Sequence, residues 1–113
     1  MSKQAFYNGI LYQIEYQPQL SKNDYTQYKV YHIKTEEENY GKSRKAIASI
    51  MEEELGYKQG YLWSAGEYYI KNTQHIKNTQ QPSMTNAFHP YYKFTYDENL
   101  DVFVFTLVIP YDD

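Results

Sequence analysis

The nearest approach to a catalytic motif in this chain is the run Gly41, Lys42 and Ser43, which matches the end of a phosphate-binding loop. Such a loop, Gly-x-x-x-x-Gly-Lys-Ser, needs its first glycine so that main-chain amides can surround the phosphates. Glu36 stands at that position, and two further glutamates follow it. Because three carboxylates would repel phosphate, the sequence predicts no nucleotide hydrolysis.

The three histidines, His32, His75 and His89, lie in different predicted elements. No two of them have the spacing that places metal ligands on one helix face, and no carboxylate motif accompanies them. Glu67 and Tyr68 are chemically suited to acid–base catalysis, alone or with His89, but their spacing selects no site. The sequence therefore predicts no metal, no cofactor and no catalytic residue, and a non-enzymatic protein is expected.

Tyrosine is the residue type that most distinguishes the chain, with 15 among its 113 residues. A tyrosine ring buries a large apolar area while its hydroxyl needs a partner or water, so tyrosine suits half-buried strand faces and binding surfaces. By strand parity, one group falls with apolar neighbours and is expected at the rim of the core: Tyr12, Tyr16, Tyr28 and Tyr61. Tyr68 and Tyr91 fall with polar or basic neighbours and are expected to face a partner.

Alternating apolar residues and turn signals predict five strands, at residues 5–17, 25–34, 61–70, 88–96 and 100–109. Between the second and third strands, apolar residues repeat at intervals of three and four and predict a helix that Gly56 ends: Ala46, Ile47, Ile50, Met51 and Leu55. Thr35 and Glu38 form a capping box that favours a helix start at Thr35. A start near Lys42 is the alternative, because Gly41 weakens the first turns.

These elements predict a single α+β domain over residues 1–113, with one helix on an antiparallel sheet in the order ββαβββ. Residues 70–80 read IKNTQHIKNTQ, a short repeat typical of a long loop or a hairpin excursion, and residues 71–86 are expected to be mobile. The last strand is apolar on both faces. It therefore needs a second sheet layer, a curled sheet or a partner chain, and a homodimer is one expected outcome.

Acidic residues are clustered, and exposed tyrosines beside them are typical of a surface that binds a basic partner protein. Glu52, Glu53 and Glu54 fall at the unfavourable end of the helix dipole, where solvent or a basic partner must compensate them. The candidate partner-binding residues are Tyr68, Tyr69, Tyr91, Lys93, Glu52, Glu53 and Glu54.

Single-stranded nucleic acid is the alternative ligand. One predicted strand face combines rings and a cation, as single-strand binders do: His89, Tyr91, Lys93 and Thr95. Lys29 and Tyr31 are expected to extend this face. The net charge of −3 opposes the alternative, since nucleic-acid binding needs a positive footprint.

Zero cysteines exclude disulfides and thiolate metal sites. The start of the chain has no signal-peptide pattern, the longest apolar run is too short to span a membrane, and no Asn-x-Ser/Thr site occurs. We therefore expect a cytoplasmic protein without membrane contact.

In its size, lack of cysteine, richness in Asn, Lys and Tyr, and absence of catalytic motifs, the chain resembles the small inhibitors that phages and mobile elements of low-GC Gram-positive bacteria encode, including anti-CRISPR proteins. The resemblance implies an inhibitor that binds a host protein or a protein–nucleic-acid complex. It assigns no functional residue.

Overall fold

The computed structural model describes residues 2–23, 26–64, 67–69, 75–77 and 89–110. They form strands β1 (Ser2–Tyr7), β2 (Ile10–Tyr16), β3 (Lys22–Asn23) and β4 (Gln27–Thr35), then helix α1 (Tyr40–Leu55). A short 3-10 turn at Pro18–Leu20 separates β2 from β3. After the helix come β5 (Trp63–Ser64), β6 (Glu67–Tyr69), β7 (His75–Lys77), β8 (Tyr91–Asp97) and β9 (Val102–Ile109). For the described residues, the prediction of one compact α+β domain with one α-helix is confirmed.

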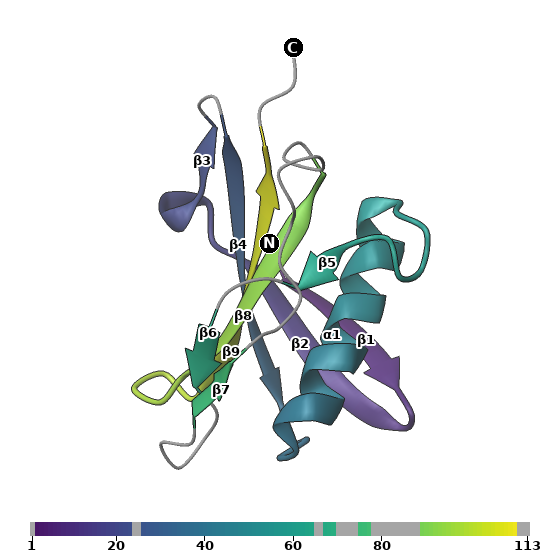
Figure 1. The fold of residues 1–113 in the computed structure, drawn as a ribbon. Coiled ribbons are helices and arrows are strands. Elements are labelled where there is room, and N and C mark those ends of the chain that lie inside the picture. Colours follow the sequence, from purple (N-terminus) through teal and green to yellow (C-terminus); the bar gives the residue numbers. More distant parts are fainter. Residues whose placement is uncertain (1, 24–25, 65–66, 70–74, 78–88, 111–113) are drawn as a thin grey trace.

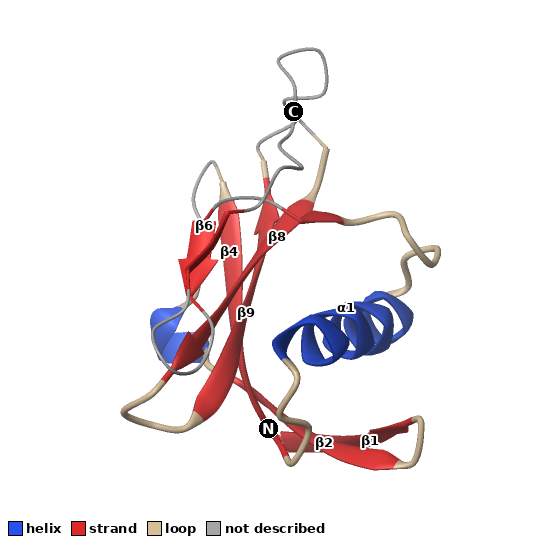
Figure 2. Ribbon diagram, turned by 60° about the horizontal axis from the view of Figure 1, so that its bottom comes forward, coloured by secondary structure: helices blue, strands red, loops and turns tan. Residues whose placement is uncertain are grey.

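The main sheet has the strand order β1-β2-β4-β9-β8-β5, with β3 paired to β4, while β6 and β7 form a separate two-stranded sheet. All neighbours in the main sheet are antiparallel except β5 and β8, which run parallel. The prediction of a purely antiparallel sheet is therefore wrong. The sheet curls around the helix, so that β1 and β2 pass beneath α1 while β8 and β9 stand beside it (Figures 1 and 2).

The single strand predicted at residues 5–17 is instead a hairpin of β1 and β2. Asn8 and Gly9 form its two-residue turn, with φ angles of 52° and 78°. Two successive positive φ angles define the turn type that suits a tight hairpin, and an Asn-Gly pair adopts it most readily. The alternation of apolar residues across the turn concealed the change of direction.

Helix α1 begins later than the capping box at Thr35 predicts. Asn39 is the N-cap, and its side-chain oxygen accepts a hydrogen bond from the Lys42 amide at 2.9 Å. Thr35 ends β4, and its hydroxyl accepts from the Glu37 amide in a local turn. The helix end is as predicted: Gly56 takes a φ of 84°, and the amides of Gly56 and Tyr57 cap the last turn.

The core lies between α1 and the concave face of the sheet, and it is rich in rings. Of the residues predicted to line one face of the helix, all but half-buried Leu55 are buried against the sheet: Ala46, Ile47, Ile50 and Met51. Tyr40 is buried too, and its hydroxyl has a partner there because it donates to the Phe94 carbonyl at 2.9 Å. The Tyr92 hydroxyl accepts from Arg44 at 2.9 Å. Buried tyrosine hydroxyls are thus satisfied by a strand carbonyl and by a helix cation.

The hairpin predicted near the end of the chain is confirmed as β8 and β9. Its turn is ordered by Asp97, whose side chain accepts from the amides of Asn99 and Leu100, and Asp101 rather than Asn99 takes the left-handed conformation. On β9, Phe103, Phe105 and Leu107 face the helix. On the other face, Val102 and Val108 are also buried, with Val108 only 1% exposed. Val102 and Val108 are therefore buried within this single chain, without a partner chain.

The strand predicted at residues 61–70 is divided between β5 and β6, which belong to different sheets. Within residues 71–86, the structure describes only β7, which pairs with β6 as a hairpin excursion would. The other residues of the predicted mobile segment lie outside the described residues. No helix in the described part of the chain is long and apolar enough to cross a membrane.

Candidate binding surface

The face of the main sheet that points away from α1, called here the outer face, carries a row of rings. Trp63 on β5 pairs with Tyr91 on β8, Tyr91 pairs with Val108 on β9, and Val108 pairs with Tyr28 on β4. Residues opposite each other in register share a face of the sheet. The row therefore crosses four strands. Tyr28, Trp63 and Tyr91 are each half-buried.

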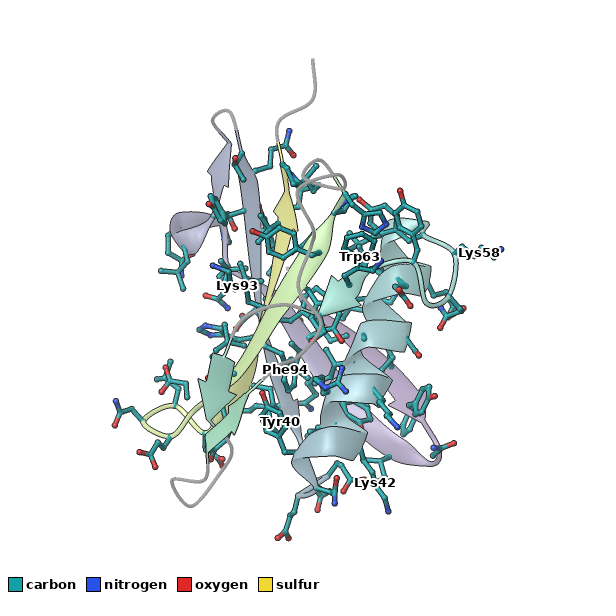
Figure 3. All side chains as sticks on the ribbon, in the orientation of Figure 1. Tyr40, Lys42, Lys58, Trp63, Lys93 and Phe94 are labelled. Carbon is teal, nitrogen blue, oxygen red and sulfur yellow. The ribbon has the colours of Figure 1, made fainter. Side chains whose placement is uncertain are left out.

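A second set of rings continues from Trp63 around the sheet edge, and Figure 3 shows Trp63 among them. Trp63 stacks on His89 with ring centres 3.9 Å apart and planes at 11°. His89 lies 4.6 Å from Tyr61, and Tyr61 stacks on Tyr57 at 5.4 Å. We call Trp63, His89, Tyr61 and Tyr57 the aromatic ladder. Together with Tyr91 and Tyr28 it forms the aromatic surface.

The ladder is held in place by the loop that joins α1 to β5. Its principal anchor is Glu52, which is 3% exposed and whose carboxylate accepts from the amides of Gly60 and Leu62 at 2.9 and 2.8 Å. Gln59 adds a hydrogen bond from its side chain to the Ser49 carbonyl. Hydrogen bonds to a charged acceptor are stronger than neutral ones. The loop that carries Tyr57 and Tyr61 is thereby fixed to the helix.

This arrangement corrects the expected acidic surface. Glu52 faces the interior and is occupied by two main-chain amides, so it is not part of an exposed patch. Glu53 and Glu54 are exposed, and Glu54 makes an ion pair with Lys3 of β1. The unfavourable charge at the end of the helix is thus compensated within the chain, by two amides and a lysine.

The structure brings some of the candidate residues together. Tyr91, Lys93 and Thr95 share the outer face as predicted, and Lys93 is exposed. Lys29 and Tyr31 do not extend this face, because they pair with Leu107 and Phe105 on the helix side. Tyr68 and Tyr69 form β6, but their side chains lie outside the described residues.

Of the four ladder residues, only His89 was a candidate in the sequence analysis; Tyr57, Tyr61 and Trp63 were missed. Tyr61 is expected at the core rim, yet it is 41% exposed. The ladder joins residues 57–63 to residue 89 through a parallel pairing of only two residues per strand. So short a strand leaves no periodicity to detect. The lone tryptophan after a glycine-containing loop was the one available signal.

Burial and mutual proximity raise the pKa of two rings on this surface. Burial is the larger cause for Tyr57, and the nearby Tyr61 adds to it. Burial also raises the pKa of Tyr91, with a further contribution from Tyr28 across the sheet. The raised pKa values extend the pH range over which both hydroxyls stay protonated. Within the described ranges, no three His, Cys, Asp or Glu side chains gather to hold a metal ion.

Comparisons of the chain with protein-family models, with curated proteins and with solved structures give no match.

Alkaline titration tests the described placement of the tyrosines. The Asp101 carboxylate accepts a hydrogen bond from the Tyr96 hydroxyl, and this bond is the main reason why the Tyr96 pKa rises to about 12. Burial is the main cause of a raised pKa for four others: Tyr12, Tyr31, Tyr57 and Tyr91. A raised folded-state pKa stabilises the protein below the unfolded value of about 10, and that contribution is lost as the pH rises through the folded value.

We therefore expect the urea midpoint to fall between about pH 10 and pH 12 as these tyrosines ionise. Tyrosinate absorbance of the folded protein should show a late-ionising group that Asp101→Asn shifts to lower pH. Asparagine suits this test because it tolerates the left-handed conformation of residue 101, where φ is 53°. An identical titration curve for the variant would contradict the assigned contact.

Proposed function

We propose that this chain is a non-enzymatic binding protein that docks a partner protein, alone or within a protein–nucleic-acid complex, on its aromatic surface. The observation that carries the proposal is the aromatic ladder, in which two stacked pairs of rings, joined by a tilted contact between Tyr61 and His89, lead from the end of α1 to the outer face. Tryptophan and tyrosine dominate the energetics of protein interfaces, since each supplies a large contact area with few rotatable bonds.

Preorganisation supports the same proposal. The ladder rings already contact one another, and Glu52 holds the loop of Tyr57 and Tyr61 through two hydrogen bonds. A partner would therefore lose little free energy to the ordering of these side chains. Lys93, exposed on the neighbouring row of the outer face, supplies a charge at the rim that can steer association. An inhibitory role, of the kind small phage proteins perform, is the part of the proposal that comes from the resemblance in composition.

The direct test is a tagged pull-down from lysate of the source cells, with nuclease-treated and untreated samples in parallel. The captured partner should survive nuclease, and Tyr61→Ala should weaken its affinity at least about tenfold, which corresponds to about 1.4 kcal/mol. Tyr61 is suitable because its exposure limits any effect on folding. Leu100→Ala is the matched control, since Leu100 is an exposed apolar residue in the β8–β9 turn, at the opposite end of β8 from Tyr91. Equal binding by Tyr61→Ala and the wild type would refute the aromatic surface as the docking site.

Single-stranded nucleic acid is the second candidate, favoured by the position of Lys93 beside the row of Tyr91. Bases stack on aromatic rings while a cation contacts the phosphates. This alternative predicts that labelled oligonucleotides bind with an affinity that falls steeply with salt, and that Lys93→Ala reduces the salt dependence. Oligonucleotides that do not bind at low salt would eliminate it.

A further inference from the structure

Strand β1 ends the main sheet, and the side away from β2 pairs with no strand among the described residues. An edge strand presents a row of main-chain amides and carbonyls that can pair with another extended segment. Its ring-bearing residue Phe6 is 72% exposed. Natural proteins usually protect such an edge. Here Lys3, the one charged residue of the strand, is engaged by Glu54.

The hairpin geometry determines which groups of β1 are available. In an antiparallel pair, residues alternate between those that bond to the neighbouring strand and those that direct their amide and carbonyl away from it. Tyr7 and Ile10 flank the two-residue turn and form the first bonded pair of such a hairpin. Gln4 and Phe6 therefore direct their main-chain groups outward, toward the open edge.

A groove of about 830 Å³ lies between this edge and α1. On the strand side it is lined by Ala5 and Tyr7, and on the helix side by Ile50 and Tyr57. Glu53 and Glu54 also line it, and Lys3 is its cation. Two carboxylates against one ammonium leave the groove with a net negative charge. The groove therefore has apolar walls and an acidic end, and it lies beside the open edge of β1.

We propose that an extended segment of a partner protein adds to β1 as a further antiparallel or parallel strand and places alternate side chains in this groove. The apolar walls fit an apolar side chain, and the acidic end fits a lysine or arginine two residues away along the segment, because side chains on one face of a strand recur every second residue. This surface is separate from the outer face and meets the aromatic ladder only at Tyr57.

Charge selects this occupant over a second copy of the chain. Pairing β1 with its own copy would bring together two grooves, each of which has a net negative charge because Glu53 and Glu54 outweigh Lys3. Like charges that approach in this way oppose association. A basic segment of another protein meets no such repulsion.

The experiment selects ligands for the full-length protein from a displayed library of random twelve-residue peptides. Enriched peptides should alternate apolar or β-branched residues with lysine or arginine. Gln4→Pro removes one outward amide and should weaken the best peptide at least about tenfold, because proline is tolerated at a sheet edge but cannot donate there. Gln4→Ala keeps the amide and should bind like the wild type.

Glu53→Lys tests the acidic end without touching the strand, and it should also weaken the peptide at least about tenfold. Glu36→Lys is its control, because it makes the same charge change at an exposed residue outside the groove.

Peptides that bind Gln4→Pro as well as the wild type, or a library without enrichment, would overturn the proposal. So would light scattering that finds a wild-type dimer and a Gln4→Pro monomer, since the edge would then pair with its own copy. Loss of partner capture in Tyr61→Ala with peptide binding intact would separate this groove from the aromatic surface.

Discussion

Replacing Glu52 by alanine is expected to lower the free energy of unfolding by about 2–4 kcal/mol, since hydrogen bonds to a charged group contribute about 1.5–3 kcal/mol each and are not fully additive. The variant leaves the amides of Gly60 and Leu62 without their acceptor. Urea unfolding measures the change. The emission of Trp63, the only tryptophan, should shift as its loop is released. Glu52→Gln keeps one oxygen acceptor and should fall between alanine and the wild type.

The neighbouring glutamate provides the control for Glu52. Glu53 is exposed at the same end of the helix, and Glu53→Ala should change stability by no more than about 0.5 kcal/mol. Equal stability of the two alanine variants would contradict a structural role for the Glu52 carboxylate.

Phe105→Ala is expected to cost about 3–5 kcal/mol, the usual range for removing a buried phenylalanine. Phe105 is 0% exposed, stacks on Tyr92 at 4.9 Å and meets Tyr31 edge-on at 6.3 Å. Because a domain of this size is stable by only about 5–15 kcal/mol, this one change removes much of the total. Urea unfolding followed by near-ultraviolet circular dichroism measures it.

Two further variants serve as comparisons for Phe105→Ala. Phe105→Leu keeps part of the side-chain volume and should retain a cooperative transition with a smaller loss of stability. Phe6→Ala removes the same ring from a site that is 72% exposed, and its effect should stay within about 0.5 kcal/mol. If Phe105→Ala were as stable as Phe6→Ala, the packing of Phe105 against Tyr92 and Tyr31 would not stabilise the core.

The sequence predicted the structure correctly where apolar residues repeat regularly over a long continuous segment. The spacing of Ala46, Ile47, Ile50 and Met51 predicted the buried helix face, and Gly56 predicted its end. The β8–β9 hairpin followed from two apolar runs around a polar turn. The helix start was misplaced because Thr35 and Asn39 are both acceptable caps, and the choice depends on where β4 ends.

Contacts between residues far apart in the sequence could not be predicted from local sequence patterns. The parallel pairing of β5 with β8 joins residues about 28 positions apart through only two residue pairs. The inward orientation of Glu52 depends on a loop that turns back over the helix, and nothing in a run of three glutamates distinguishes the first from the others. The outer face was predicted in part, because parity placed Tyr91 and Lys93 together, but parity alone could not show which face of β4 would join them.

The place of β9 in the sheet also governs when this domain can form. β9 lies between β4 and β8, so the two halves of the main sheet meet only through the last of the described strands. Non-local pairing of this kind slows folding, since long loops must close before the contacts form. During synthesis, β1, β2, β4 and α1 emerge first and must wait with an open sheet edge at β4. A ribosome-bound chain lacking residues 102–109 should therefore remain protease-sensitive and dependent on chaperones, and the domain should assemble only after β9 has cleared the exit tunnel.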